Sequence, residues 1–177
     1  MPAIVDKAAK RSEIVRHAAD VFARTGYHVT KMQDIATEAD IGKGTIYEYF
    51  RAKEQLFLAV YDLWMSEYEE LIRQRVEASP DAMSKVDAIR DSAVEFYASR
   101  AEQAPLLLEF WAHALRTDNP AFLERITSTR TFLRDLGIKL TRELVDAGWF
   151  TDVDARAFAD LEAGISDGIF LAWVLEG

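Results

Sequence analysis

Residues 30–53 read Thr30-Lys-Met-Gln-Asp-Ile-Ala-Thr-Glu-Ala-Asp40-Ile-Gly-Lys-Gly-Thr-Ile-Tyr-Glu-Tyr-Phe50-Arg-Ala-Lys53. This stretch predicts two short helices joined by a tight turn. Thr30, followed three residues later by Gln33, has the form of a capping box, so the first helix is expected to begin at Lys31. Asp40 suits the turn, because aspartate adopts a left-handed backbone more readily than most residues.

The second helix of this stretch, expected over about Lys43–Tyr49, has an unusual outer surface. Ile46 is its one position that faces a core, and Phe50 follows just beyond its end. The positions turned outward include two aromatic residues, Tyr47 and Tyr49. A helix-turn-helix accounts for them, because its second helix enters the major groove of DNA.

Composition restricts the class of protein. The chain has 177 residues, half of them apolar, and no cysteine, which excludes a zinc finger, a disulfide scaffold and a cysteine nucleophile. No apolar run reaches membrane-spanning length and the N-terminus lacks a signal-peptide pattern, so a cytoplasmic protein is expected. Apolar residues recur at intervals of three and four throughout, which predicts an all-α fold.

The distribution of charge is uneven. The net charge is −9, which by itself argues against nucleic acid as a partner. Residues 1–53, however, hold 9 Lys and Arg against 7 Asp and Glu, a net of +2, and residues 54–177 hold 12 against 23, a net of −11. This polarity supports DNA binding only beside the helix-turn-helix, since ordinary scatter of charge also gives +2.

The remaining pattern predicts two domains. A first helix over about 7–25, ended by Gly26, completes a three-helix DNA-binding domain at residues 1–52. A larger helical domain for ligand binding and dimerisation is expected at residues 53–177. Its helices are expected over about 53–76, 85–100, 106–115, 120–147 and 153–175, with Ser84 and Asp152 as the caps of the second and the last.

Many residues of the first third stand at fixed spacing: Ile14, Ala18, Ala19, Phe22, Gly26, Tyr27, Thr30, Asp34, Ile35, Ala36, Ala39, Ile41, Lys43, Gly44, Thr45, Ile46, Tyr47, Tyr49, Phe50, Lys53 and Leu56. This series resembles the DNA-binding domain of the TetR/AcrR family of bacterial transcriptional regulators, over about residues 10–57. The sequence departs from the usual pattern at Asp40, where glycine is common, and at Gly42 and Ala52, where serine often caps a helix. A phosphate contact from a serine at position 42 is thereby lost.

The resemblance implies a set of DNA-contacting residues: Thr30, Lys43, Gly44, Thr45, Tyr47, Tyr49 and Lys53. Lys43 and Thr45 are expected at base edges, and Gly44 is expected to let the backbone approach closely. The hydroxyls of Tyr47 and Tyr49, the Lys53 ammonium and the Thr30 hydroxyl are expected at phosphates, which fix register while base contacts carry sequence information. The alternative for Tyr47 is a ring that belongs partly to the core.

The last helix is apolar nearly all round, which a terminal helix of a small protein cannot bury within one subunit. A helix-packing seam is expected at Phe158, Leu161, Gly164, Ile165, Gly168 and Ala172. As in the family, two helices from each of two subunits would form a four-helix bundle, so a homodimer is predicted. The alternative is a purely intramolecular core.

A ligand pocket, as in the family, is predicted among aromatic residues of the middle helices and one histidine: Trp64, Tyr68, Phe96, Phe110, Trp111, His113 and Phe132. The alternative is core packing, and His113 is equally well interpreted as an interior histidine. Glu95 and Glu109 neighbour aromatic residues. A buried carboxylate there would favour a cationic ligand, although surface exposure is expected for both.

The sequence therefore predicts a repressor that binds an inverted-repeat operator as a homodimer and is released by a small, largely apolar or aromatic ligand. The alternatives are a helical interaction module and a constitutive regulator without a ligand. No nucleophile–base pair, glycine-rich phosphate loop or metal-ligand spacing is visible, so neither an enzyme nor a cofactor or metal site is predicted. If the resemblance holds, the protein acts at the nucleoid in a bacterial cytoplasm.

Overall fold

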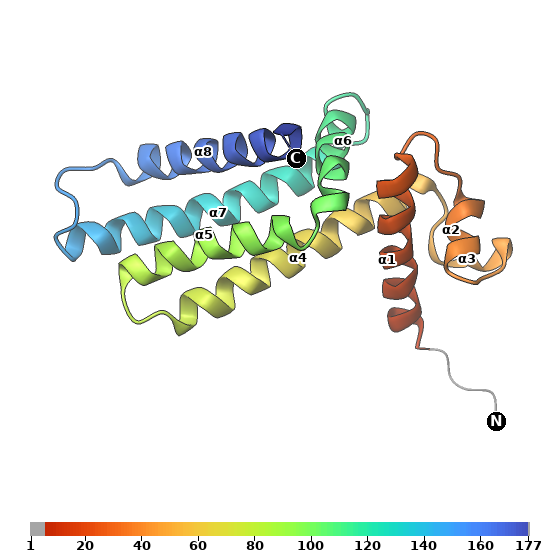
Figure 1. The fold of residues 1–177 in the computed structure, drawn as a ribbon, viewed down its shortest axis with the longest axis horizontal. Helices are drawn as coiled ribbons and strands as arrows, with labels where there is room; N and C mark the ends of the chain where they lie inside the picture. The colour runs from red at the N-terminus through yellow and green to blue at the C-terminus, as the bar shows by residue number, and fades with distance from the viewer. Residues whose placement is uncertain (1–5, 177) are drawn as a thin grey trace. The chain divides into compact units, whose positions relative to one another are not determined.

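The computed structural model describes residues 6–176, and over this range the chain is helical without a β-strand (Figure 1). The elements are α1 (Lys7–Thr25), α2 (Met32–Glu38), α3 (Lys43–Tyr49), α4 (Lys53–Ala78), α5 (Ala82–Ala98), the 3₁₀ turn η1 (Ala101–Gln103), α6 (Ala104–Ala114), α7 (Pro120–Asp146) and α8 (Ala155–Glu176). The predicted all-α class is confirmed.

The chain forms two compact units. The first comprises the described residues up to Trp64 together with Glu102–Phe122, and the second comprises Met65–Ala101 and the residues from Leu123 on. The predicted domain boundary at residue 53 coincides with the start of α4, whereas the first unit also takes in the beginning of α4 and all of α6. Among the described helices, none is both long enough and apolar enough to span a membrane.

The first unit has an aromatic core beneath the helix-turn-helix. Phe22 of α1 meets Phe57 of α4 edge to face at a centroid distance of 5.4 Å, and Phe57 meets Phe110 of α6 at 5.2 Å. Ile35 of α2 and Ile46 of α3 are fully buried. Because α2 and α3 each bury few side chains, their orientation depends on packing of α2 against α1 and of α3 against α2 rather than on helix propensity.

The turn between α2 and α3 agrees with its prediction. Asp40 has φ 49°, and the Ile41 N–H donates to the Ala36 carbonyl at 2.9 Å. A left-handed residue here directs the chain sharply into α3. The predicted ranges of α1 and α3 are also confirmed.

Helix starts differ from prediction at α2. The Thr30 hydroxyl donates to the Gly26 carbonyl at 2.7 Å, behind the helix rather than into it. The N-cap is Lys31, whose N–H donates to the Asp34 carboxylate at 2.8 Å. The predicted capping box of Thr30 and Gln33 is therefore wrong.

Two caps of the second unit also lie elsewhere than predicted. Asp81, not Ser84, caps α5, and its carboxylate accepts the Ser84 N–H at 2.9 Å. Asp154, not Asp152, caps α8, where its carboxylate accepts the N–H groups of Arg156 and Ala157. Both helices consequently begin a few residues away from their predicted starts.

The second unit packs α4, α5, α7 and α8 around a core of aromatic and aliphatic residues. Tyr97 of α5 stacks on Phe170 of α8 at 4.5 Å. A Cβ on Gly137 of α7 would lie 3.1 Å from the Ala159 Cβ of α8, so these two helices approach closely at a glycine. Ion pairs such as Lys85–Glu143, at 2.6 Å, join α5 to α7 at the surface.

Candidate nucleic-acid interface

The outer face of α3 is the candidate recognition surface. Ile46 and Phe50 anchor the helix in the core, which turns Lys43, Gly44 and Tyr47 to solvent. Tyr47 is 43% exposed, so the alternative of a ring that belongs to the core does not describe it. A Cβ added to Gly44 would meet no described atom within 4 Å, which leaves the helix backbone open to close approach.

Thr45 and Tyr49 are half-buried on the same helix. Thr45 lies near the helix start, where the Thr45 Oγ1 would be 3.7 Å from a Cβ built on Gly42. Five of the seven predicted DNA-contacting residues thus lie on one short helix. This helix presents hydroxyls, an ammonium and exposed backbone, the groups used to read base edges and phosphates.

Thr30 does not lie where its predicted role requires. Its side chain is 2% exposed, and its hydroxyl is within hydrogen-bond distance of the Gly26 carbonyl and of the Thr25 hydroxyl, at 2.7 and 2.6 Å. In this conformation the hydroxyl cannot reach a phosphate. The sequence identifies a threonine before α2, but only the packed loop decides which way its hydroxyl points.

Lys53 also lies differently from expectation. Its ammonium donates to the carbonyls of Tyr27, of His28 at 3.0 Å and of Thr30 at 2.8 Å, and it lies 4.5 Å from the centre of the Tyr27 ring. Burial lowers the pKa of the Lys53 ammonium, and the nearby Glu109 carboxylate opposes that shift. The side chain is therefore directed into the protein and not toward a phosphate.

Sequence reasoning missed Arg11. Its guanidinium carbon lies 4.7 Å from the centre of the Phe50 ring, directly beside the end of α3, and the residue is exposed. Helical periodicity places Arg11 on the solvent-exposed face of α1. Only the fold shows that this face adjoins the recognition helix.

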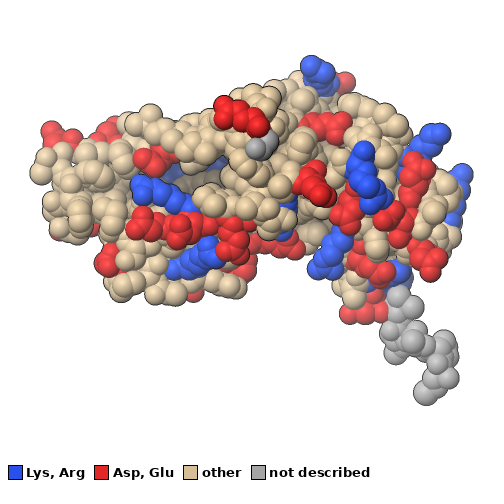
Figure 2. All heavy atoms as spheres, viewed as in Figure 1, with Lys and Arg blue, Asp and Glu red and all other residues tan. Residues whose placement is uncertain are grey.

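Basic and acidic groups alternate around the helix-turn-helix. In the view of Figure 2, lysines and arginines are interspersed with aspartates and glutamates over α1, α2 and α3. Lys10 pairs with Glu13 at 2.9 Å and Arg24 with Glu38 at 2.7 Å. The modest excess of +2 predicted for this region therefore does not form one continuous basic face in this view.

The residues predicted to line a ligand pocket divide between the two units. Trp64, Phe110, Trp111 and His113 belong to the first, and Tyr68, Phe96 and Phe132 to the second. Phe110 stacks on Tyr61 at 4.0 Å, and Phe96 lies 4.7 Å from Tyr68. Core packing describes both of these phenylalanines, because they are almost completely buried.

His113 packs into the aromatic core of the first unit. Its ring lies edge to face with Tyr27 at 4.8 Å and with Phe122 at 4.6 Å. Its Nε2 lies 3.5 Å from a Glu54 oxygen, and within the described residues it has no hydrogen-bond partner. This environment is that of an interior histidine, the alternative left open from the sequence.

Glu95 and Glu109 are both engaged within the chain. Glu95 pairs with Arg75, and the Glu109 carboxylate accepts the Tyr27 N–H at 2.9 Å. The expectation that Glu109 lies at the surface is wrong, because it is half-buried against the loop after α1. Neither is therefore the buried, unpaired carboxylate that would favour a cationic ligand.

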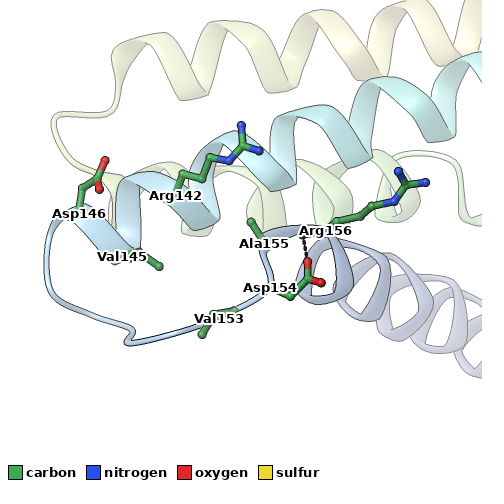
Figure 3. A pocket seen from close by; sticks show the side chains of 7 residues that line it. All are labelled: Arg142, Val145, Asp146, Val153, Asp154, Ala155 and Arg156. Atoms are coloured by element: carbon green, nitrogen blue, oxygen red, sulfur yellow. Dashed lines mark hydrogen bonds between the residues drawn. The ribbon is translucent and has the colours of Figure 1, made fainter.

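A pocket of about 310 Å³ lies elsewhere, where α7 ends and α8 begins (Figure 3). Its lining is Arg142, Val145, Asp146, Val153, Asp154, Ala155 and Arg156. The lining includes none of the residues predicted for the ligand pocket. Its charged groups are two arginines and two aspartates, and Asp154 is already engaged in capping α8.

The outer face of α8 carries the residues predicted for dimerisation. Leu161 and Ile165 are 59% and 47% exposed, and Cβ atoms on Gly164 and Gly168 would meet no described atom within 4 Å. Ala172 is exposed on the same face. Phe158 differs, because it is half-buried and lies 5.2 Å from Phe150. The alternative of a purely intramolecular core does not describe this face.

Comparison with known proteins places the helix-turn-helix in a family. Residues 14–60 match the family described as bacterial regulatory proteins, tetR family. Over 80 residues, 45% of this chain and 41% of the relative, the chain is 30% identical to the fatty acid metabolism regulator protein of Bacillus subtilis (strain 168). The chain spans 41% to 47% of the length of the first curated relatives that it matches.

Solved structures match over nearly the whole chain. A TetR transcription regulator from Haloarcula marismortui ATCC 43049 aligns with a TM-score of 0.87 at 23% identity, covering 95% of this chain and 87% of that one. The regulator FadR from Bacillus subtilis, solved in complex with stearoyl-CoA, aligns with a TM-score of 0.79 at 22% identity, covering 93% and 87%. At these identities the likeness establishes the fold alone. Residues 14–60 of this chain therefore form a helix-turn-helix domain of the kind described for bacterial regulatory proteins of the tetR family.

Proposed function

We propose that this protein is a repressor that binds an inverted-repeat DNA operator as a homodimer in the bacterial cytoplasm. The observation that carries the proposal is the outer face of α3, where Lys43, Gly44 and Tyr47 are turned to solvent on a helix anchored by two buried residues. A helix of this kind serves as the reading element of a helix-turn-helix. The family match over residues 14–60 supports this role.

The proposed division of labour follows the positions on α3. Lys43 and Thr45, near the start of the helix, read base edges. Tyr47 and Tyr49 donate their hydroxyls to phosphates, and Arg11 adds a positive charge beside the end of the helix. Phosphate contacts set the register and the few base contacts set the sequence preference.

Selection of bound DNA from a random pool tests this proposal. The selected sites should be inverted repeats, with half-site centres about 10 bp or a multiple of it apart, because each recognition helix of a dimer occupies one major groove. Thr45→Ala should relax the preference at one base position in each half-site. Thr37→Ala is the matched control, since Thr37 is an exposed threonine of α2 whose hydroxyl bonds the Gln33 carbonyl. Selected sites without symmetry would contradict the proposal.

We propose further that a small ligand bound in the helical part releases the DNA. The FadR relative was solved with stearoyl-CoA, so acyl-CoA thioesters are the first ligands to test, beside small aromatic compounds. A ligand that releases DNA must bind the DNA-incompetent state better, and by linkage DNA must weaken the ligand by the same factor.

A thermal-shift screen of acyl-CoA thioesters of different chain length, followed by gel shift, measures this coupling. Trp64→Ala and Trp111→Ala should lose the response and keep DNA binding. Trp149→Ala, at an exposed tryptophan of the α7–α8 loop, should keep both. Operator affinity that stays unchanged with every stabilising compound would contradict ligand release.

A further inference from the structure

The segment between α1 and α2, residues 26–31, is held by side chains from two other helices of the same unit. It has no regular structure of its own to fix it, and it leads directly into the helix-turn-helix. Lys53 of α4 and Glu109 of α6 together make four hydrogen bonds to the backbone of this segment. The position of this segment decides where α2 begins.

Lys53 binds the segment through its ammonium group. An ammonium has three N–H donors, and the three carbonyls of Tyr27, His28 and Thr30 match that number. The Tyr27 ring, 4.5 Å away, adds a cation–π contact. A DNA phosphate could recruit Lys53 only by taking donors away from these carbonyls.

Glu109 binds the segment from the side of α6. Its Oε2 accepts the Tyr27 N–H at 2.9 Å, and its Oε1 would lie 3.5 Å from a Cβ on Gly26. Gly26 has φ 79°, so glycine is required here by the backbone conformation. Both backbone polar groups of Tyr27 are thus bound: its N–H donates to Glu109 of α6, and its C=O accepts from Lys53 of α4.

We propose that Lys53 and Glu109 are positioning residues for DNA recognition, which fix residues 26–31 and hence α2 and α3, and that Lys53 acts without contacting a phosphate. The role rests on the proposed recognition by α3, and the binding of the unmodified protein tests that separately. Glu109 also makes the segment sensitive to the position of α6. A shift of α6 would release the Tyr27 N–H and loosen the start of α2.

The dependence of DNA affinity on salt separates positioning from phosphate contact. Each lost phosphate contact lowers the slope of log affinity against log salt by about 0.9. Lys53→Met should lower affinity about tenfold at every salt concentration, with an unchanged slope, because a charged hydrogen-bond network is lost. Arg11→Gln is the matched control, because it removes an exposed positive charge beside the end of α3, and its slope should fall by about 1 per subunit.

Lys53→Arg separates the two roles in a second way. Arginine binds phosphate at least as well as lysine, but its planar fork does not match three converging carbonyls. Positioning predicts that Lys53→Arg also loses affinity with an unchanged slope. A phosphate contact predicts that it binds as well as the unmodified protein.

For Glu109, the electrostatic effect and the positioning effect on DNA affinity are expected in opposite directions. Removal of a negative charge should strengthen DNA binding through electrostatics alone. Positioning predicts instead that Glu109→Ala weakens binding, and that Glu109→Gln, whose amide oxygen can still accept the Tyr27 N–H, retains most of it. Glu102→Ala, at an exposed glutamate of η1, is the matched control and should not weaken binding.

The DNA affinity of each variant is measured on DNA selected by the unmodified protein. Hydrogen exchange of the peptide that spans residues 26–31 is measured on the same variants. Exchange there should accelerate in Lys53→Met and Glu109→Ala while α1 stays protected. The inference is overturned if Lys53→Met lowers the salt slope by about 1 per subunit, if Lys53→Arg binds normally, or if Glu109→Ala binds as tightly as the unmodified protein. Failure of the unmodified protein to select any DNA would instead overturn the proposed recognition by α3.

Discussion

At the scale of single residues, Gly26 and Gly44 have different backbone requirements. Gly26 ends α1 with φ 79° and ψ 151°, a conformation reached almost only by glycine. Gly44 lies inside α3 with ordinary helical geometry, and a Cβ there would meet no described atom within 4 Å. The first glycine is required by the fold, whereas the second is compatible with any small side chain in the absence of DNA.

Alanine at these two glycines should therefore act in opposite directions on stability. Gly26→Ala should destabilise the protein by about 1–3 kcal/mol through backbone strain. Gly44→Ala should stabilise it by about 0.5 kcal/mol or be neutral, because alanine favours the helix, yet it should weaken DNA binding by filling the space between α3 and the groove. Thermal unfolding and gel shift of both variants measure the two effects. A Gly44→Ala variant with full DNA affinity would argue against close backbone approach.

The same scale shows why two predicted DNA-contacting residues bond to other groups of the chain in this structure. Lys53 and Thr30 are the residue types expected at a phosphate, and the sequence places both beside the helix-turn-helix. The Lys53 ammonium bonds carbonyls of the loop after α1, 23 to 26 residues away, and the Thr30 hydroxyl bonds the Gly26 carbonyl. A local pattern identifies the type of side chain, but not which distant carbonyl its donors will reach.

At the scale of elements, the helices were predicted correctly, whereas the caps of α2, α5 and α8 were not. In α2 the N-cap position is Lys31, one residue after the predicted Thr30, and its side chain makes no cap bond. In α5 and α8 several residues that can cap stand close together, and the residue chosen from the sequence was two or three positions from the true cap. Judged from the sequence alone, these residues are nearly equally suited to cap the helix. Packing of the helix selects among them, because the start must suit the buried face.

Asp154 and Asp152 allow this to be tested on α8. Asp154→Ala should cost about 1 kcal/mol, since its carboxylate accepts two helix N–H groups. Asp152 has φ 53°, so Asp152→Gly should be neutral or slightly stabilising. Thermal unfolding at one fixed protein concentration measures both. A larger loss for Asp152→Gly would restore the cap predicted from the sequence.

At the scale of the whole molecule, one surface of the single chain is unusually apolar. Leu161, Ile165, Ile169 and Leu175 of α8 are each about half or more exposed, with glycines between them. Apolar patches of this kind on small proteins mark association sites. A second copy of the chain fits, because a two-fold axis pairs the same patch with itself.

Ile165→Arg should therefore give a folded monomer. The residue is 47% exposed in the single chain, so the charge harms the subunit little, whereas it would be buried unpaired in a dimer at a cost of several kcal/mol. Ser166→Arg is the matched control, on an exposed neighbour about 100° around the helix. Sedimentation measures the mass and gel shift the affinity, which should collapse with the dimer. A monomeric unmodified protein at micromolar concentration would contradict the assembly.

The sequence by itself determined the all-α class, the helix-turn-helix and the face of α3 that is turned outward. These depend on periodicities of three and four residues, which are local and leave a readable pattern. Tertiary structure alone decided that Lys53 and Glu109 bind the loop after α1, that Arg11 adjoins Phe50 and that Asp154 caps α8. The Tyr27 N–H and the Glu109 carboxylate are 82 residues apart in the chain. Such a pair has no period, and it forms only when packing of α1, α4 and α6 brings the two groups within hydrogen-bond distance.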